Sequence, residues 1–80
     1  MRVDVLLFAS LKDELGPQVS VDVAEPATVA SLRGALEAAY PAIARFGGKA
    51  KAAVNEKWAR ETDAVNRGDA VALLPPVAGG

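Results

Sequence analysis

The stretch RVDVLLFASLKDELGPQVSVDV, residues 2–23, decides the fold because it holds two strand patterns joined by one short connection. Apolar side chains recur at every second position in residues 2–8 and again in residues 18–23, which is typical of strands with one buried face. The connection is short enough for the two strands to pair as an antiparallel hairpin. The side chains expected on the buried face are those of Val3, Val5, Leu7, Val19, Val21 and Val23.

The connection itself carries the signals of a short helix. Ser10 can cap its first turn, and Asp13 lies three residues later at the reciprocal capping-box position. Gly16 followed by Pro17 ends the pattern. We therefore expect one or two helical turns between the strands.

Residues 28–40 predict the main helix of the chain. Thr28 is a good N-cap, and Pro41 forces Tyr40 out of helical geometry. Gly34 in mid-helix costs roughly 1 kcal/mol relative to alanine, from which we infer close backbone packing at that position. The apolar face expected to pack on the sheet consists of Val29, Leu32 and Leu36.

The remainder of the chain predicts an irregular connection and three further strands. Residues 41–48 form the connection, in which Ile43 and Phe46 close one end of the core. Residues 51–59 read as two short strands with a turn between them, and residues 66–69 as a turn. The last strand, in residues 70–75, is expected to point Val71 and Leu73 inward and Ala72 and Leu74 outward.

The order strand, strand, helix, short strands, strand indicates an α+β fold of the β-grasp, or ubiquitin-like, arrangement, in which a mixed sheet packs on one main helix. The first and last strands would then be neighbours at the centre of the sheet. Residues 1–76 are expected to form this domain and residues 77–80 a flexible C-terminal tail.

Composition excludes many kinds of chemistry. The 80 residues can bury only one core. They include no cysteine and no histidine, which excludes disulfides, thiolate nucleophiles, imidazole bases and nitrogen or sulfur metal ligands. We expect no metal site, no cofactor bound by this chain, and no catalytic activity of the chain alone.

The charge pattern also limits the partners. The net charge is −1 and the nine basic residues are scattered along the sequence, which argues against nucleic-acid binding. The apolar run near the N-terminus is broken by Asp4 and is too short for a signal peptide, so we expect a cytoplasmic protein with no membrane span.

The C-terminal residues PPVAGG resemble an extended arm more than a packed element. Pro75 and Pro76 remove ladder hydrogen bonds and keep the chain extended as it leaves the last strand. Val77 and Ala78 continue the arm, and the two glycines that follow, Gly79 and Gly80, carry no side chain that would hinder entry into a narrow tunnel. The terminal carboxylate of Gly80 is thus the candidate reactive group.

Three segments resemble the small subunit of molybdopterin synthase, a family of ubiquitin-like sulfur carriers with a C-terminal diglycine. They are LFASLKDELG at residues 7–16, AAVN at residues 52–55 and GDAVALLPPVAGG at residues 68–80. The resemblance implies that Gly80 is adenylated by an E1-like enzyme using ATP and magnesium and is then converted to a thiocarboxylate. It further implies sulfur transfer to a pyranopterin precursor within a heterotetramer of two small and two large subunits, the large subunit supplying the catalytic side chains.

The same resemblance and the strand pattern point to one partner surface. Phe8, Trp58 and Leu74 are large apolar side chains on positions expected to face water. Two positions depart from the family ending. Ala70 stands where an acidic residue is common, and Ala78 replaces a serine or threonine.

Other charged residues receive simpler interpretations. Lys49 and Lys51 are taken as solvent-facing charges without a role, and Asp69 as a local turn acceptor. Arg33 and Glu37 are expected to form an exposed pair on the main helix.

Three alternatives to the molybdopterin pathway remain open. A carrier of the same chemistry can serve thiamine synthesis, cysteine synthesis or tRNA thiolation. A protein modifier would end with Gly80 in an isopeptide bond to a lysine. A plain binding domain would have an inert tail.

Overall fold

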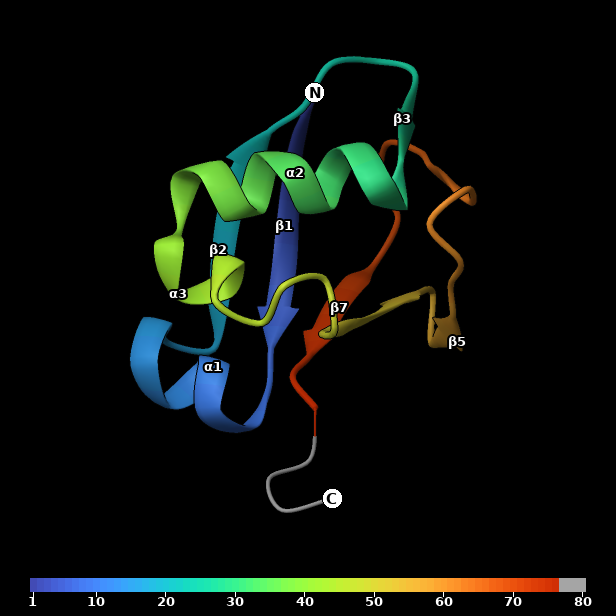
Figure 1. Ribbon diagram of the computed structural model, residues 1–80. Coiled ribbons are helices and arrows are strands. Elements are labelled where there is room, and N and C mark those ends of the chain that lie inside the picture. The colour runs from blue at the N-terminus through green and yellow to red at the C-terminus, as the bar shows by residue number, and fades with distance from the viewer. Residues whose placement is uncertain (77–80) are drawn as a thin grey trace.

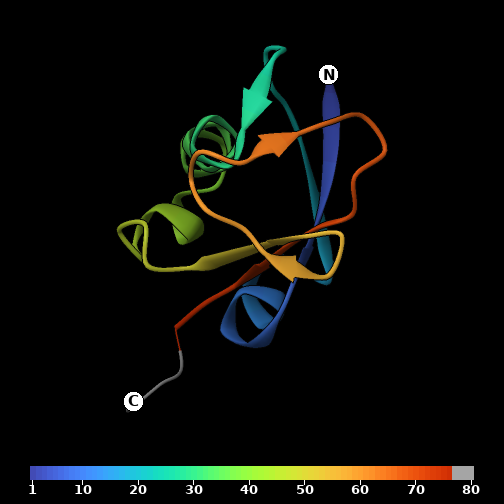
Figure 2. The ribbon, with the colours of Figure 1, turned by 90° about the vertical axis from the view of Figure 1, so that its right-hand side faces the viewer.

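The computed structural model describes residues 1–76, in which a mixed sheet packs against one long helix (Figure 1). Figure 2 looks nearly along that helix, α2, and shows it on one side of the strands. The elements in chain order are β1 Arg2–Leu7, α1 Ala9–Leu15, β2 Gln18–Asp22, β3 Ala27–Thr28, α2 Val29–Ala39, α3 Pro41–Ala44, β4 Lys51–Val54, β5 Lys57–Trp58, β6 Ala64–Val65 and β7 Val71–Leu74.

The large sheet has the strand order β2-β1-β7-β4-β5. β1 pairs antiparallel with β2, as the hairpin pattern predicts, and parallel with β7. β4 pairs antiparallel with both β7 and β5. The first and last strands are therefore central neighbours, and the expected β-grasp fold is confirmed.

The main helix begins and ends where the sequence predicts. The Ser31 backbone N–H donates to the Thr28 hydroxyl over 3.2 Å, and the Thr28 backbone N–H donates to the Ser31 hydroxyl over 2.9 Å. This reciprocal pair satisfies two N–H groups at the start of the helix. At the other end Tyr40 is extended and Pro41 opens the short helix α3.

The core lies between the sheet and the helices. Every buried position predicted in the strands and in α2 is buried, and Ile43 of α3 is only 1% exposed. Phe46 is half-buried and packs on this core from its margin. At the β2 edge the Tyr40 hydroxyl donates to the Ser20 carbonyl over 2.9 Å, which fastens the end of α2 to the sheet.

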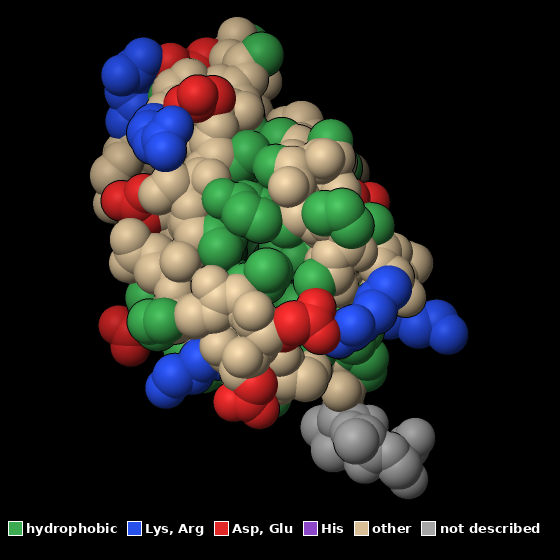
Figure 3. All heavy atoms as spheres, turned by 90° about the vertical axis from the view of Figure 1, so that its left-hand side faces the viewer, with side chains coloured by type: hydrophobic (Ala, Val, Ile, Leu, Met, Phe, Trp, Pro, Cys, Tyr) green, Lys and Arg blue, Asp and Glu red, His purple; other side chains and the backbone are tan. Residues whose placement is uncertain are grey.

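The view from the side on which α1 and α3 lie shows where the hydrophobic layer reaches the surface. Hydrophobic side chains gather in the middle of this face, and charged side chains lie around its margin (Figure 3). Leu15 and Tyr40 are among the partly buried residues that pack against the core.

Two predictions about the helices are wrong. α1 begins two residues earlier than a Ser10 cap predicts, at Ala9, and its N-cap position is Phe8, which makes no side-chain cap. Ser10 is already inside the first turn, so its hydroxyl is not the N-cap. At Gly34 an added Cβ would meet nothing within 4 Å, so close backbone packing does not explain this glycine.

The second small sheet, β3 with β6, was not predicted. Its two-residue strands are too short to show a period in the sequence. This sheet holds the segment before β6 against the start of α2, and backbone carbonyls of that segment accept hydrogen bonds from the first turn of the helix. Val29 N–H donates to the Asp63 carbonyl over 2.9 Å and Ala30 N–H to the Glu61 carbonyl over 3.0 Å.

Glu61 is consequently held beside α2, where it pairs with Arg33, for which the sequence predicts Glu37 as partner. Arg33 donates to both carboxylate oxygens of Glu61, from Nε over 2.9 Å and from Nη2 over 3.0 Å. The predicted pair with Glu37 is wrong, because a bidentate contact to Glu61 is geometrically better than an i,i+4 contact along the helix.

Candidate docking face and tail root

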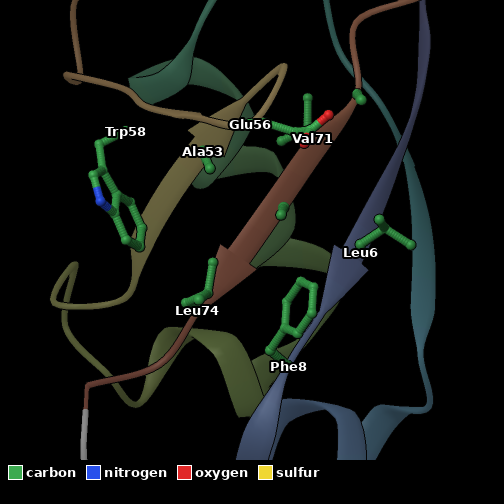
Figure 4. Close-up of a pocket in the computed structure, with 9 residues that line it drawn as sticks. Leu6, Phe8, Ala53, Glu56, Trp58, Val71 and Leu74 are labelled. Carbon is green, nitrogen blue, oxygen red and sulfur yellow. The ribbon is translucent and has the colours of Figure 1, made fainter.

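The face of the large sheet that points away from α2 carries a row of apolar side chains. Leu6 of β1 pairs with Ala72 of β7, and Ala72 pairs on its other side with Ala53 of β4. Ala53 in turn pairs with Trp58 of β5. Large side chains stand at both ends of the row and alanines in its middle, which leaves a shallow hollow of about 360 Å³ (Figure 4).

Phe8 and Leu74 extend this surface toward the end of the sheet where β1 and β7 finish (Figure 4). Trp58 is 66% exposed and Phe8 43%, whereas Leu74 is half-buried. The structure thus brings the three predicted interface residues to one hollow. We call this surface the apolar face and define it by Leu6, Phe8, Ala53, Trp58, Ala72 and Leu74.

Leu6 belongs to this surface but was not among the predicted residues. It is 44% exposed, slightly more than Phe8. Its signal was present in the sequence, because it shares the outward parity of Phe8 within the first strand. Isolated exposed leucines are common, and only the register beside Ala72 shows that this one joins a larger apolar surface.

The tail leaves the domain beside the apolar face. Because β7 runs parallel to β1, it ends at the same edge of the sheet, and Pro75 and Pro76 follow directly. A second hollow of about 470 Å³ surrounds this exit and shares Trp58 and Leu74 with the first. The tail residues Val77, Ala78, Gly79 and the candidate reactive Gly80 lie outside the described residues.

A turn network fixes the start of β7. The Asn55 side chain donates to the Asp69 carboxylate over 3.0 Å and accepts from the Ala70 backbone N–H over 2.9 Å. Asp69 also accepts from the Asn66 backbone N–H over 2.8 Å, and these hydrogen bonds hold the pKa of Asp69 below its usual value. The prediction that Asp69 is a local turn acceptor is confirmed, and Gly68 in the same turn has a positive φ of 83°.

The other lowered carboxylate pKa values belong to ion pairs away from the apolar face. The hydrogen bond from Arg33 lowers the pKa of Glu61, and the hydrogen bond from Arg67 lowers the pKa of Glu25. Both pairs link segments distant in sequence, the first joining α2 to the chain before β6. Neither carboxylate lines the hollow between Leu6 and Trp58, so these pKa shifts do not mark the apolar face.

Within residues 1–76, no three metal-ligating side chains come together. In the same part of the chain, no helix is long and apolar enough to cross a membrane. What the described surface offers is an apolar hollow beside the exit of the tail, which is a geometry for docking another protein.

Comparison with known proteins gives one family and several similar structures. The model of the ThiS family matches residues 5–80. The crystal structure of SAMP1 from Haloferax volcanii is 34% identical in sequence, covers 100% of both chains and superposes with a TM-score of 0.83.

Two further structures are described as molybdopterin-converting factors. One, from Helicobacter pylori, is a complex of subunits 1 and 2 and contains a chain 26% identical over 100% of both chains, with a TM-score of 0.69. The other, a putative subunit 1 from Pyrococcus furiosus, is 21% identical, covers 95% of this chain and 98% of its own, and has a TM-score of 0.80, which supports the fold alone.

Proposed function

The chain belongs to the ThiS family, and we propose that it is a sulfur carrier, the small subunit of a molybdopterin synthase. The observation that carries the proposal is the place where the tail begins. Pro75 and Pro76 follow β7 directly beside the apolar face, so one partner can cover that face and receive the residues that follow them. The proposal places the chain in the cytoplasm, where ATP is available for its activation.

The proposed chemistry takes place at the Gly80 carboxylate. A carboxylate oxygen attacks the α-phosphorus of ATP on an E1-like adenylating enzyme, which releases pyrophosphate and leaves an acyl adenylate. A sulfide-equivalent nucleophile then attacks the acyl carbon and AMP departs, which leaves a thiocarboxylate. This chain supplies the acyl group and the docking surface, and the enzyme supplies ATP, magnesium and the catalytic groups.

The proposed acceptor is a large synthase subunit. A structurally similar chain is found in a complex of subunits 1 and 2 of the molybdopterin-converting factor, which supports a partner of this kind. The large subunit would cover Phe8, Trp58 and Leu74 and take Gly79 and Gly80 into its active site. Two small and two large subunits would form the heterotetramer, and the transferred sulfur would go to the pyranopterin precursor.

A second candidate function, protein modification, is favoured by one comparison. The Haloferax volcanii chain that is 34% identical is named a small archaeal modifier protein. The chemistry to the adenylate is shared, but a lysine amine of a target replaces sulfur as the nucleophile. The product is then an isopeptide at Gly80 and not a thiocarboxylate.

An acceptor assay separates these functions. The thiocarboxylated chain is mixed with the large subunit from the same source and the pyranopterin precursor, and dithiolene formation and the C-terminal mass of the chain are followed. We expect product to form while Gly80 returns to a carboxylate. Product formation with none of the large subunit present, or conjugates that persist in denaturant in place of product, would contradict the proposed pathway. A variant with one alanine added after Gly80 is the matched control, since the added residue lies outside the described residues 1–76.

A further inference from the structure

Two lysines lie beside the tail root, the point at which Pro75 and Pro76 leave the sheet. Lys49 precedes β4, and Lys51 is its first residue. Both are exposed and both line the hollow around Pro75 and Pro76 together with Trp58. All three also line a neighbouring hollow that continues around the sheet edge toward Arg33 and Arg60. Trp58 therefore joins the apolar face to a basic margin, which we define as Lys49, Lys51 and Arg60.

The charge of this margin is only partly compensated within the described residues. Arg60 has Asp63 at 3.8 Å, a long contact between exposed side chains. In residues 1–76 no carboxylate lies within ion-pair distance of Lys49 or Lys51. Among the described residues, the two lysines thus present two positive charges that have no carboxylate partner at the point where the tail begins.

Lys51 is also held close to the aromatic anchor of the apolar face. Its ammonium nitrogen lies 5.6 Å from the centroid of the Trp58 ring, within the range of a cation–π contact. At the other side of the hollow the turn between β4 and β5 places the acidic Glu56. Positive charge therefore lies at the tail root, and one carboxylate, that of Glu56, lines the hollow of the apolar face at the turn between β4 and β5.

We propose that the basic margin receives an acidic segment of the same protein that takes the tail, with its carboxylates opposite Lys49 and Lys51 and its apolar side chains over Trp58. The inference rests on the proposed function and adds the charge of the partner surface to it. Complementary charge at the rim of an interface speeds association and fixes orientation, and its effect weakens with salt. Such orientation is useful here because the tail must enter from one side only.

A protein partner fits this margin better than a small phosphate ligand. The buried donor in this region, Arg33 Nη1, has no hydrogen-bond partner within residues 1–76 but is covered from solvent, so an entering anion cannot reach it. The other three cations that line this hollow are exposed side chains and do not enclose a site for a small anion. They are Lys49, Lys51 and Arg60. A protein surface can place carboxylates opposite the basic margin and apolar side chains opposite the apolar face at the same time.

The test compares two charge reversals of equal size. One variant is Lys49→Glu with Lys51→Glu, and the control is Lys12→Glu with Lys57→Glu, since those lysines are also exposed and line none of the hollows near the tail. Association rates with the large subunit from the same source are measured by stopped flow at low and high salt. Thermal unfolding of both variants checks that the fold is intact.

We expect the first variant to associate about tenfold more slowly than the unaltered chain at low salt, and the difference to shrink at high salt. An equal loss in the control, or no loss in the first variant, would overturn the inference while leaving the proposed function in place. Failure of the unaltered chain to bind the large subunit would remove the proposed function and this inference with it. If the isolated chain binds ATP and the Lys49→Glu, Lys51→Glu variant does not, the basic margin is a phosphate site and the inference is overturned.

Discussion

Replacement of Trp58 by alanine should separate docking from folding. Trp58 is 66% exposed, so only about a third of its surface is covered in the isolated chain. A fully covered tryptophan buries about 150–250 Å², and a third of that is roughly 50–80 Å². At about 25 cal/mol per Å² the lost burial lowers the free energy of unfolding by at most about 1–2 kcal/mol.

Leu36 gives the matched comparison from the core. It is a smaller side chain but only 1% exposed, on the face of α2 that packs on the sheet. Truncation of such a leucine to alanine lowers the free energy of unfolding by about 3–5 kcal/mol. Since a domain of this size has roughly 4–12 kcal/mol of stability in total, Leu36→Ala should bring the chain close to unfolding.

For the affinity toward the large subunit the order should reverse, with Trp58→Ala causing the larger loss and Leu36→Ala the smaller one. A tryptophan at the centre of an interface typically contributes about 2 kcal/mol or more, so Trp58→Ala should weaken binding to the large subunit about 30-fold. Denaturant unfolding gives the stabilities, and titration calorimetry with the large subunit gives the affinities at a temperature where both variants are folded. If Trp58→Ala is as destabilising as Leu36→Ala, or binds with unchanged affinity, the assignment of Trp58 to a docking surface is wrong.

Further predictions follow from the helix, the glycines and the ion pairs. Thr28→Ala removes the reciprocal cap and should lower the free energy of unfolding by about 1 kcal/mol, or the melting temperature by roughly 4–8 °C; an unchanged melting curve would contradict the role of the cap. Gly34→Ala should raise stability by about 0.5–1 kcal/mol because nothing lies within 4 Å of the added Cβ, whereas Gly68→Ala, at φ +83°, should lower it by about 1 kcal/mol; the opposite order in denaturant unfolding would refute both. Because Arg33 lowers the pKa of Glu61 in the folded chain, the pair stabilises at neutral pH and this contribution is lost as the pH falls through that lowered pKa. Melting temperatures of Glu61→Gln between neutral and acidic pH should therefore fall less steeply than those of the unaltered chain, and parallel curves would show that the pair has no such effect.

Much of the fold could be predicted because local patterns and tertiary packing agree. The valines of β2 and the apolar face of α2 follow their periods without interruption, and Thr28 and Pro41 mark the helix ends in the sequence. The exceptions depend on contacts distant in the chain. Glu61 reaches Arg33 only because the segment before β6 lies against α2, and no spacing rule connects residues 28 positions apart.

The candidate site shows the same division. The outward parity of Phe8, Trp58 and Leu74 was readable from single strands, but their grouping depends on the strand order. The place of Leu6 in this surface depends on its neighbour Ala72 on another strand, which the pattern of the first strand alone does not reveal. The role of the lysines at the tail root likewise depends on β4 lying beside the end of β7, which places Lys51 opposite Leu74.

The measurement that tests the central claim most directly is a search for sulfur on Gly80. The chain is incubated with an E1-like adenylating enzyme from the same source, ATP, magnesium and a sulfur donor, and is then treated with a thiol-alkylating reagent. Because the chain contains no cysteine, a thiocarboxylate is the group expected to label readily. The account predicts ATP-dependent label confined to the C-terminal peptide. Adenylation without label, or conjugates to other proteins in its place, would contradict the claim that this chain carries sulfur.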